Sequence, residues 1–301
     1  MSFYLKIRTE NKISYKDLIS NLKFSEAAVI QSNSFDDLIN EDSCKAFLPN
    51  ESTRGVTLKY VNSEYSIGIN VISSETDFEL ALNITEVISI LTDSLILPEG
   101  REKPIDTIVF KNEFNKAWID KEKLVGVDIF LDNIGNEGDT LAIGCCDLTY
   151  LVGPKIHSQL DKSSEHEYYN SLVNKIRNSQ FFDRQKYAIP NTIQVTNRET
   201  GELKRVIVLY QNGNQFLPKS ELLVIKLGNE RIELPYNRIS EIANDKFSLL
   251  DEEQYLVDTL TDDEFQNILI TAKTILSKPP PKAQIQENQS IETQSKWWKF
   301  W

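Results

Sequence analysis

Residues 52–93, STRGVTLKYVNSEYSIGINVISSETDFELALNITEVISILTD, decide the fold. β-Branched and aromatic residues recur in rough alternation over 55–61 and again over 65–72, which is the pattern of half-buried strands. Asn62-Ser63-Glu64 lies between them and suits a turn, because Asn tolerates positive φ. This part of the stretch therefore predicts a β-hairpin.

A long helix is predicted directly after the hairpin. Ser74 and Asp77 form a capping-box pattern at its start, and it should end near Thr92. Its apolar positions cover a wide face, so the helix should be buried on most sides. They are Phe78, Leu80, Ala81, Leu82, Ile84, Val87, Ile88, Ile90 and Leu91. A hairpin joined to a buried helix predicts an α+β fold.

The composition is that of a globular protein rather than a membrane-spanning one. The 301 residues allow one large or two ordinary domains, and no apolar run approaches the length of a spanning helix. The N-terminus has no signal-peptide pattern, and three cysteines give no disulfide framework, so we expect a cytoplasmic protein. The net charge of −12 argues against nucleic-acid binding and would suit a basic protein partner.

The pattern of strands followed by a helix recurs loosely and predicts two mixed antiparallel-sheet/helix halves. Gly153-Pro154 marks the boundary between an N-terminal α+β domain, 1–153, and a C-terminal α+β domain, 154–277. Further elements are predicted in both halves. The predicted strands are 3–9, 27–31, 107–110, 141–146 and 148–152. The predicted helices are 14–23, a helical turn at 34–39, and 163–177, which Ser163 should cap. The pattern of 114–130 fits either a helix or a strand.

The C-terminal half should be an antiparallel meander closed by a helix. Its predicted strands are 192–196, 203–210, 221–227 and 231–234, and the connections between them look too short for a parallel crossover. Thr261 and Glu264 form a capping box at the start of the last helix.

The chain ends in a polar tail with an aromatic and basic tip. Residues 278–295 are rich in Pro, Gln and Ser and predict a disordered linker. The tip, 296–301, is the predicted partner-binding motif, consisting of Lys296, Trp297, Trp298, Lys299, Phe300 and Trp301. Tryptophan is a frequent interface anchor, and aromatic residues beside lysines also suit a membrane surface. Docking on a protein, contact with a membrane, and folding back onto its own domain all stay open.

The titratable residues show no catalytic or metal-binding spacing. His157 and His166 are expected in structural or surface roles, and Cys44, Cys145 and Cys146 as small buried apolar residues. Residues 135–139 match neither a phosphate loop nor a calcium loop. The acidic runs 251–253 and 262–264 are expected to be solvated. We therefore expect no metal, no cofactor and no catalytic residue.

Several segments resemble an uncharacterised bacterial protein family of similar length. The segments that carry the likeness are Ser52–Tyr60, Tyr65–Asn70, Thr76–Leu82, Leu151–Pro154 and Ile268–Leu276. The resemblance implies a shared fold over most of residues 1–277 and brings no catalytic signature. The acidic build with an aromatic-basic end is also similar in style to immunity proteins of bacterial toxin systems.

These observations predict a non-enzymatic, cytoplasmic protein-binding module. If the similarity to immunity proteins holds, the module neutralises a toxin, and the acidic charge of the chain suggests that this toxin is basic. The alternative is an adaptor or peripheral membrane protein recruited through Lys296–Trp301. A second alternative is an enzyme with a carboxylate-based site, because such sites leave no local motif. Oligomeric state and the identity of the partner stay open.

Overall fold

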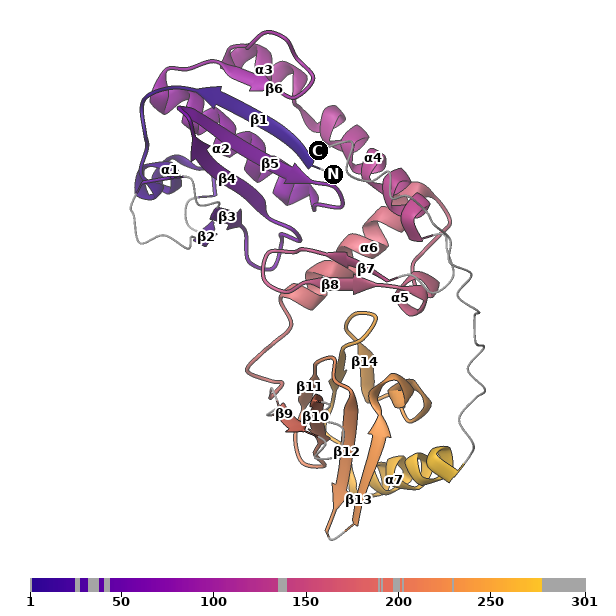
Figure 1. Cartoon of the computed structure of the whole chain (residues 1–301). Coiled ribbons are helices and arrows are strands. Elements are labelled where there is room, and N and C mark those ends of the chain that lie inside the picture. Colours follow the sequence, from indigo (N-terminus) through magenta and orange to yellow (C-terminus); the bar gives the residue numbers. More distant parts are fainter. Residues whose placement is uncertain are drawn as a thin grey trace. The chain divides into compact units, whose positions relative to one another are not determined.

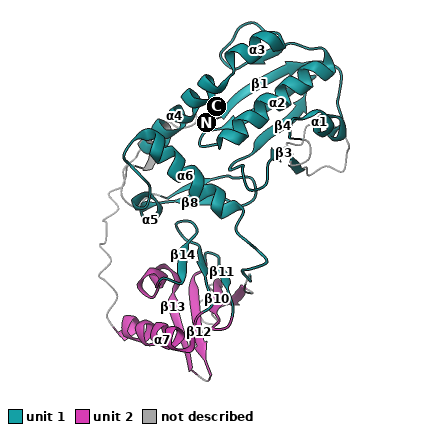
Figure 2. Cartoon of the chain, turned by 180° about the vertical axis from the view of Figure 1, so that it is seen from behind, with its two compact units in different colours: residues 1–190, 213–219, 245–259 teal, residues 191–212, 220–244, 260–301 magenta. Residues whose placement is uncertain are grey.

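The computed structural model describes most of the chain. The described residues are 2–24, 28–31, 38–40, 44–134, 140–188, 190, 192–196, 201, 203–228 and 230–277. The chain folds as two compact units (Figure 2). Unit 1 comprises residues 1–190, 213–219 and 245–259, and unit 2 comprises the rest. The predicted boundary at Gly153-Pro154 falls inside unit 1.

Unit 1 is built on a six-stranded sheet in the order β2-β3-β4-β5-β1-β6. Every neighbouring pair in it is antiparallel. The strands are β1 (Ser2–Arg8), β2 (Val29–Gln31), β3 (Cys44–Phe47), β4 (Val56–Val61), β5 (Glu64–Asn70) and β6 (Ile96–Pro98). The α+β fold class predicted from the sequence is confirmed.

The predicted hairpin and helix are present as β4, β5 and α2 (Glu75–Thr92). Asn62 and Ser63 take positive φ angles of 51° and 58°, which allows the tight connection. The predicted capping box of Ser74 and Asp77 is complete in both directions. Helix α2 covers one face of the sheet, and no helix of the described residues covers the opposite face (Figures 1 and 2).

Asp77 ties the loop before the hairpin to the start of α2. Its side chain is fully buried and accepts hydrogen bonds from the backbone amides of Thr53 at 3.0 Å, Arg54 at 3.1 Å and Gly55 at 3.2 Å. It also accepts from the Ser74 amide at 3.0 Å, as part of the capping box. A buried carboxylate needs such donors, and here they join the two halves of the decisive stretch.

Residues 107–134 are helical, which corrects one prediction and resolves another. They form α3 (Thr107–Glu113) and α4 (Lys116–Ile134). The strand predicted at 107–110 is wrong because Asp106 caps a helix there, accepting from the amides of Ile108 and Val109. The ambiguous segment 114–130 enters α4, where Ile119, Lys123 and Val127 are buried at four-residue intervals.

A second apolar cluster of unit 1 lies around a hairpin and three helices, and includes Val127 and Phe130 of α4. Its other elements are β7 (Leu141–Ile143), β8 (Tyr150–Val152), α5 (Pro154–Ser158) and α6 (Glu165–Gln180). Ser164 rather than the predicted Ser163 caps α6, accepting from the Glu167 amide. Helix α1 (Tyr15–Asn21) packs near α2, and its fully buried Leu18 belongs to the apolar cluster that the six-stranded sheet forms with α2.

Residues 245–259 belong to unit 1 partly because Glu252 caps α5. Its carboxylate accepts from the amides of Gly153 at 3.1 Å, Lys155 at 3.1 Å and Ile156 at 3.0 Å. Asp251 and Glu252 are buried, with exposed fractions of 1% and 6%, so the prediction that this acidic run is solvated is wrong. The run lies between two strands of a three-stranded sheet, β11 (Gln215–Leu217), β15 (Tyr255–Val257) and β14 (Phe247–Leu249).

Unit 2 contains a four-stranded sheet in the order β13-β12-β10-β9 and the helix α7 (Asp262–Ser277). Its strands are β9 (Ile193–Thr196), β10 (Leu203–Leu209), β12 (Leu222–Leu227) and β13 (Glu230–Pro235), and the 3-10 turn η1 (Tyr236–Glu241) follows. The capping box of Thr261 and Glu264 is confirmed. The all-antiparallel meander is wrong, because β10 and β12 run parallel. The chain leaves this sheet between them to form β11, which supplies the crossover.

Some predictions fall outside the described residues. They concern the helical turn at 34–39, of which only Leu38 and Ile39 are described, the linker 278–295 and the tip 296–301. Within the described ranges, no helix combines the length and apolar character that crossing a bilayer requires.

Candidate functional site

The candidate site is the face of the six-stranded sheet that α2 does not cover. Side chains alternate along a strand, so Lys6 and Arg8 point away from the buried Leu5 and Ile7. The strand register carries the same face across the sheet, since Ser66 lies opposite both Lys6 on β1 and Lys59 on β4. We call this surface the open face.

The open face is basic although the chain is acidic. Strands β1, β3, β4 and β5 carry four basic residues and one acidic residue, a net charge of +3. They are Lys6, Arg8, Lys45, Lys59 and Glu64, and the register places all of them on the open face. The whole chain carries −12, so the strands concentrate a charge of the opposite sign on one surface.

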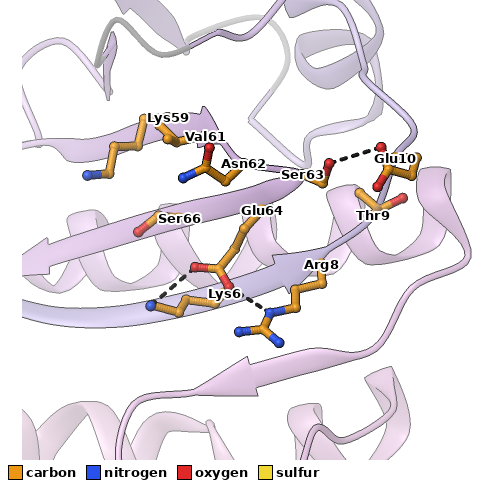
Figure 3. A pocket seen from close by; sticks show the side chains of 10 residues that line it. All are labelled: Lys6, Arg8, Thr9, Glu10, Lys59, Val61, Asn62, Ser63, Glu64 and Ser66. Atoms are coloured by element: carbon orange, nitrogen blue, oxygen red, sulfur yellow. Dashed lines mark hydrogen bonds and ion pairs between the residues drawn. The ribbon is translucent and has the colours of Figure 1, made fainter.

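A shallow depression of about 730 Å³ lies at one end of this face. Figure 3 shows Lys6, Arg8, Lys59 and Glu64 projecting around it from three adjacent strands. The volume falls in the range of ligand-binding clefts, but nine of the ten residues that line the depression are polar or charged. Such a surface suits a charged or extended partner better than a small apolar molecule.

Glu64 forms two ion pairs at the floor of the depression. Its carboxylate lies 3.2 Å from the Lys6 ammonium and 3.1 Å from the Arg8 guanidinium. Partial burial alone would raise the pKa of Glu64, but hydrogen bonds from Arg8 and Lys6 outweigh it and hold that pKa below its ordinary value. The Arg8 side chain stays 82% exposed and the Lys6 side chain 44% exposed, so both cations still face solvent.

Lys59 supplies a third cation from β4. In the described part of the chain, its ammonium group takes part in no hydrogen bond or ion pair. It therefore keeps its full capacity to donate three hydrogen bonds to an anionic partner. Lys45, further along the face, donates to the Cys145 carbonyl at 2.6 Å.

The rim of the depression is held by hydrogen bonds between distant segments. Ser63 in the hairpin turn donates to the Glu10 carboxylate at 2.9 Å and accepts from the Thr9 amide at 2.9 Å. The buried Tyr60 donates its hydroxyl to the Thr9 carbonyl at 2.8 Å. These contacts fix the loop after β1 beside the β4–β5 turn, so the depression is part of a rigid scaffold.

The residues singled out in the sequence lie elsewhere. Lys296–Trp301 are outside the described residues. His166 is exposed on α6, and His157 lies 5.9 Å from the ring of Tyr168, where burial and the charge of Lys162 lower its pKa.

The three cysteines are buried and free, as predicted. Burial raises the pKa of Cys44 to about 11, and the pKa values of Cys145 and Cys146 to about 12. These side chains are therefore neutral thiols at physiological pH and not activated nucleophiles.

Sequence reasoning missed the open face. The signal was present, because Lys6, Arg8 and Lys59 occupy alternate positions of strands that were predicted from their pattern. Their meeting on one surface depends on the order and register of the strands, which are not local properties.

The fold and the open face define an α+β protein with a one-sided antiparallel sheet. The chain belongs to the family described as Domain of unknown function (DUF4299), whose model matches residues 1–229. The resemblance to an uncharacterised family is therefore confirmed. No curated protein and no solved structure matches the chain. The matched residues include every side chain of the depression.

Proposed function

We propose that this protein is a non-enzymatic binding module that holds an acidic segment of a partner protein on its open face. The observation that carries the proposal is the net charge of +3 on four adjacent strands of a chain that carries −12. Electrostatic complementarity of this kind fixes the register of a partner and raises its rate of encounter.

The distribution of charge supports an oriented encounter. Acidic segments are repelled by most of the surface of a chain with net charge −12, and attracted only where cations are concentrated. Three cations project from strands whose opposite face is packed in the core, so they need little reorganisation to meet a partner. The ion pairs of Glu64 also hold two of these cations in place.

Toxin neutralisation stays a prediction from the sequence. A basic toxin would be drawn to the acidic remainder of the surface, whereas the open face favours an acidic partner. The two ideas therefore predict opposite charge preferences, and the same binding experiment separates them.

Recruitment through the C-terminal tip is a second candidate function. Its support is compositional, because three of the four tryptophans and two lysines lie within Lys296–Trp301. Deletion of 296–301 should abolish flotation with vesicles containing anionic lipid and leave the thermal midpoint nearly unchanged. Equal flotation with and without the tip would exclude this role, and a large fall in the midpoint would indicate that the tip packs on its own domain.

The main proposal is tested with two fluorescent peptides of equal length, oligoglutamate and oligolysine. Fluorescence anisotropy at low salt should detect binding of oligoglutamate, weakened as salt is added. The variant Lys6→Gln/Arg8→Gln should lower that affinity about tenfold, if each exposed charge contributes somewhat under 1 kcal/mol.

A matched control removes the same two residue types from unit 2. Lys273 and Arg231 are each about half exposed, and each is ion-paired with a glutamate, as Lys6 and Arg8 are with Glu64. Lys273→Gln/Arg231→Gln should leave oligoglutamate binding within about twofold. Equal losses in both double variants, or binding of oligolysine alone, would contradict the proposal.

A further inference from the structure

Strand β9 forms an exposed edge of the sheet in unit 2. Its four residues, Ile193–Thr196, are all exposed, and among the described strands it pairs with β10 alone. The apolar side chains of Ile193 and Val195 are 50% and 46% exposed. The outer backbone groups of an edge strand are a ready template for pairing with another strand.

The opposite edge of the same sheet is protected against such pairing. Strand β13, Glu230–Pro235, carries three charged residues and ends in a proline. Charges and proline on an edge strand are the usual obstacles to edge-to-edge association. Strand β9 has neither, since it reads Ile-Gln-Val-Thr. One sheet therefore has one blocked edge and one edge that is chemically open.

We infer that β9 pairs antiparallel with β9 of a second copy of this chain. Gln194 would lie opposite Gln194 of the second copy. In this register, Ile193 of each copy lies opposite Val195 of the other copy, and both pairs are on the same face of the sheet. This register joins the two four-stranded sheets into one continuous sheet around a twofold axis. β-Branched residues in directly opposite positions are favourable cross-strand pairs.

The uncharged sequence of β9 is what permits a second copy at this edge. Two chains that each carry −12 repel one another, and contact costs least where both surfaces are uncharged. Strand β9 is such a surface and is complementary to itself in the register above. If a strand of another protein occupies this edge instead, the purified chain should stay monomeric at every concentration.

Analytical ultracentrifugation of the full chain over increasing protein concentration tests the pairing. The wild type should approach twice the 34.6 kDa mass of one chain at high concentration. Val195→Lys should stay monomeric, because it puts a charge opposite Ile193 of the second copy. Ile90→Lys is the control, since Ile90 is 60% exposed on α2 and should not affect association.

A cross-linking variant tests the register without depending on the lysine substitution. Gln194→Cys should form a disulfide-linked dimer under mild oxidation, because opposite Cα atoms of an antiparallel pair lie about 4.5–5.5 Å apart. The native cysteines are buried, and Ser20→Cys on the exposed side of α1 is the matched control. A wild type that stays monomeric, a dimer that persists in Val195→Lys, or equal cross-linking of the two cysteine variants would overturn the inference.

Discussion

The same strands make both faces of the six-stranded sheet, but one face is buried and apolar and the other is exposed and basic. On the α2 side, Leu5, Ile7, Leu58 and Ile67 are fully buried. On the open face, the alternate positions include Lys6, Arg8 and Lys59, whose charged side chains remain exposed to solvent. An antiparallel sheet covered on one side permits this division. One set of residues stabilises the fold, and the other set is available for binding.

The same contrast separates two carboxylates. Asp77 is buried and accepts from backbone amides, whereas Glu64 lies on the open face and pairs with two cations. Removing the Asp77 carboxylate should leave buried amides without an acceptor, whereas removing the Glu64 carboxylate should leave only solvated cations. The cost to stability should therefore differ greatly between them.

Asp77→Ala should give the largest loss of stability. Three buried or partly buried N–H groups lose their acceptor and the Ser74 amide loses one of two, so we expect the free energy of unfolding to fall by about 3–5 kcal/mol. Urea denaturation followed by circular dichroism measures it. Glu79→Ala, an exposed acid two residues along α2, should change it by less than about 0.5 kcal/mol. Similar losses in both variants would show that Asp77 does not anchor the loop.

Leu58→Ala and Lys59→Ala compare the two faces at neighbouring residues of β4. Leu58 is fully buried, so its truncation should cost about 2–5 kcal/mol, and Lys59 is exposed, so its truncation should cost less than about 0.5 kcal/mol. Only Lys59→Ala should weaken oligoglutamate binding once both variants are folded. A loss of stability in Lys59→Ala as large as in Leu58→Ala would contradict the division between the faces.

Glu252→Ala tests whether a buried carboxylate from a distant segment holds α5 in place. The change removes the acceptor of three amides at the start of that helix, and helix caps contribute about 1–2 kcal/mol. Hydrogen exchange of the amides of residues 153–158 should accelerate, while exchange in β4 and β5 stays as in the wild type. Unchanged hydrogen exchange at α5 would show that Glu252 does not hold this helix in place.

Glu64 should show a small, pH-dependent contribution. Its pKa in the folded state is below the ordinary value of 4.5, so the ion pairs stabilise the fold above that pH and the contribution is lost as the pH falls through the folded-state pKa. The difference in thermal midpoint between wild type and Glu64→Gln should therefore be present at pH 7 and vanish in acid. The contribution of these ion pairs to the free energy of unfolding should be less than about 1 kcal/mol. A difference that grows in acid would have the wrong sign.

The sequence predicted the local elements of the decisive stretch well. The hairpin, the turn at Asn62 and the capping box of Ser74 depend on neighbouring residues, and all are present. The strand predicted at 107–110 failed because Ile108 and Val109 suggest a strand, whereas Asp106 before them caps a helix. A capping side chain outweighed the intrinsic preference of two β-branched residues.

The remaining errors concern partners that are distant in the sequence. The parallel pairing of β10 with β12 depends on β11, whose own partner is β15. The burial of Glu252 depends on the start of α5, about a hundred residues earlier. The grouping of cations on the open face likewise follows from the order of β1, β5 and β4 in the sheet, which the sequence pattern does not predict. Periodicity predicts which residues share a face of one strand, but not which strands are neighbours.

Lysine acylation footprinting, with and without saturating oligoglutamate, tests the central claim most directly. Lys6 and Lys59 should lose reactivity when the peptide binds, because their ammonium groups would contact it. Lys111 belongs to α3 and Lys273 to α7 of unit 2; each is about half exposed, neither is part of the open face, and both should react as before. Protection confined to Lys6 and Lys59 is the predicted result, and protection of Lys111 or Lys273 with Lys6 and Lys59 still reactive would contradict it.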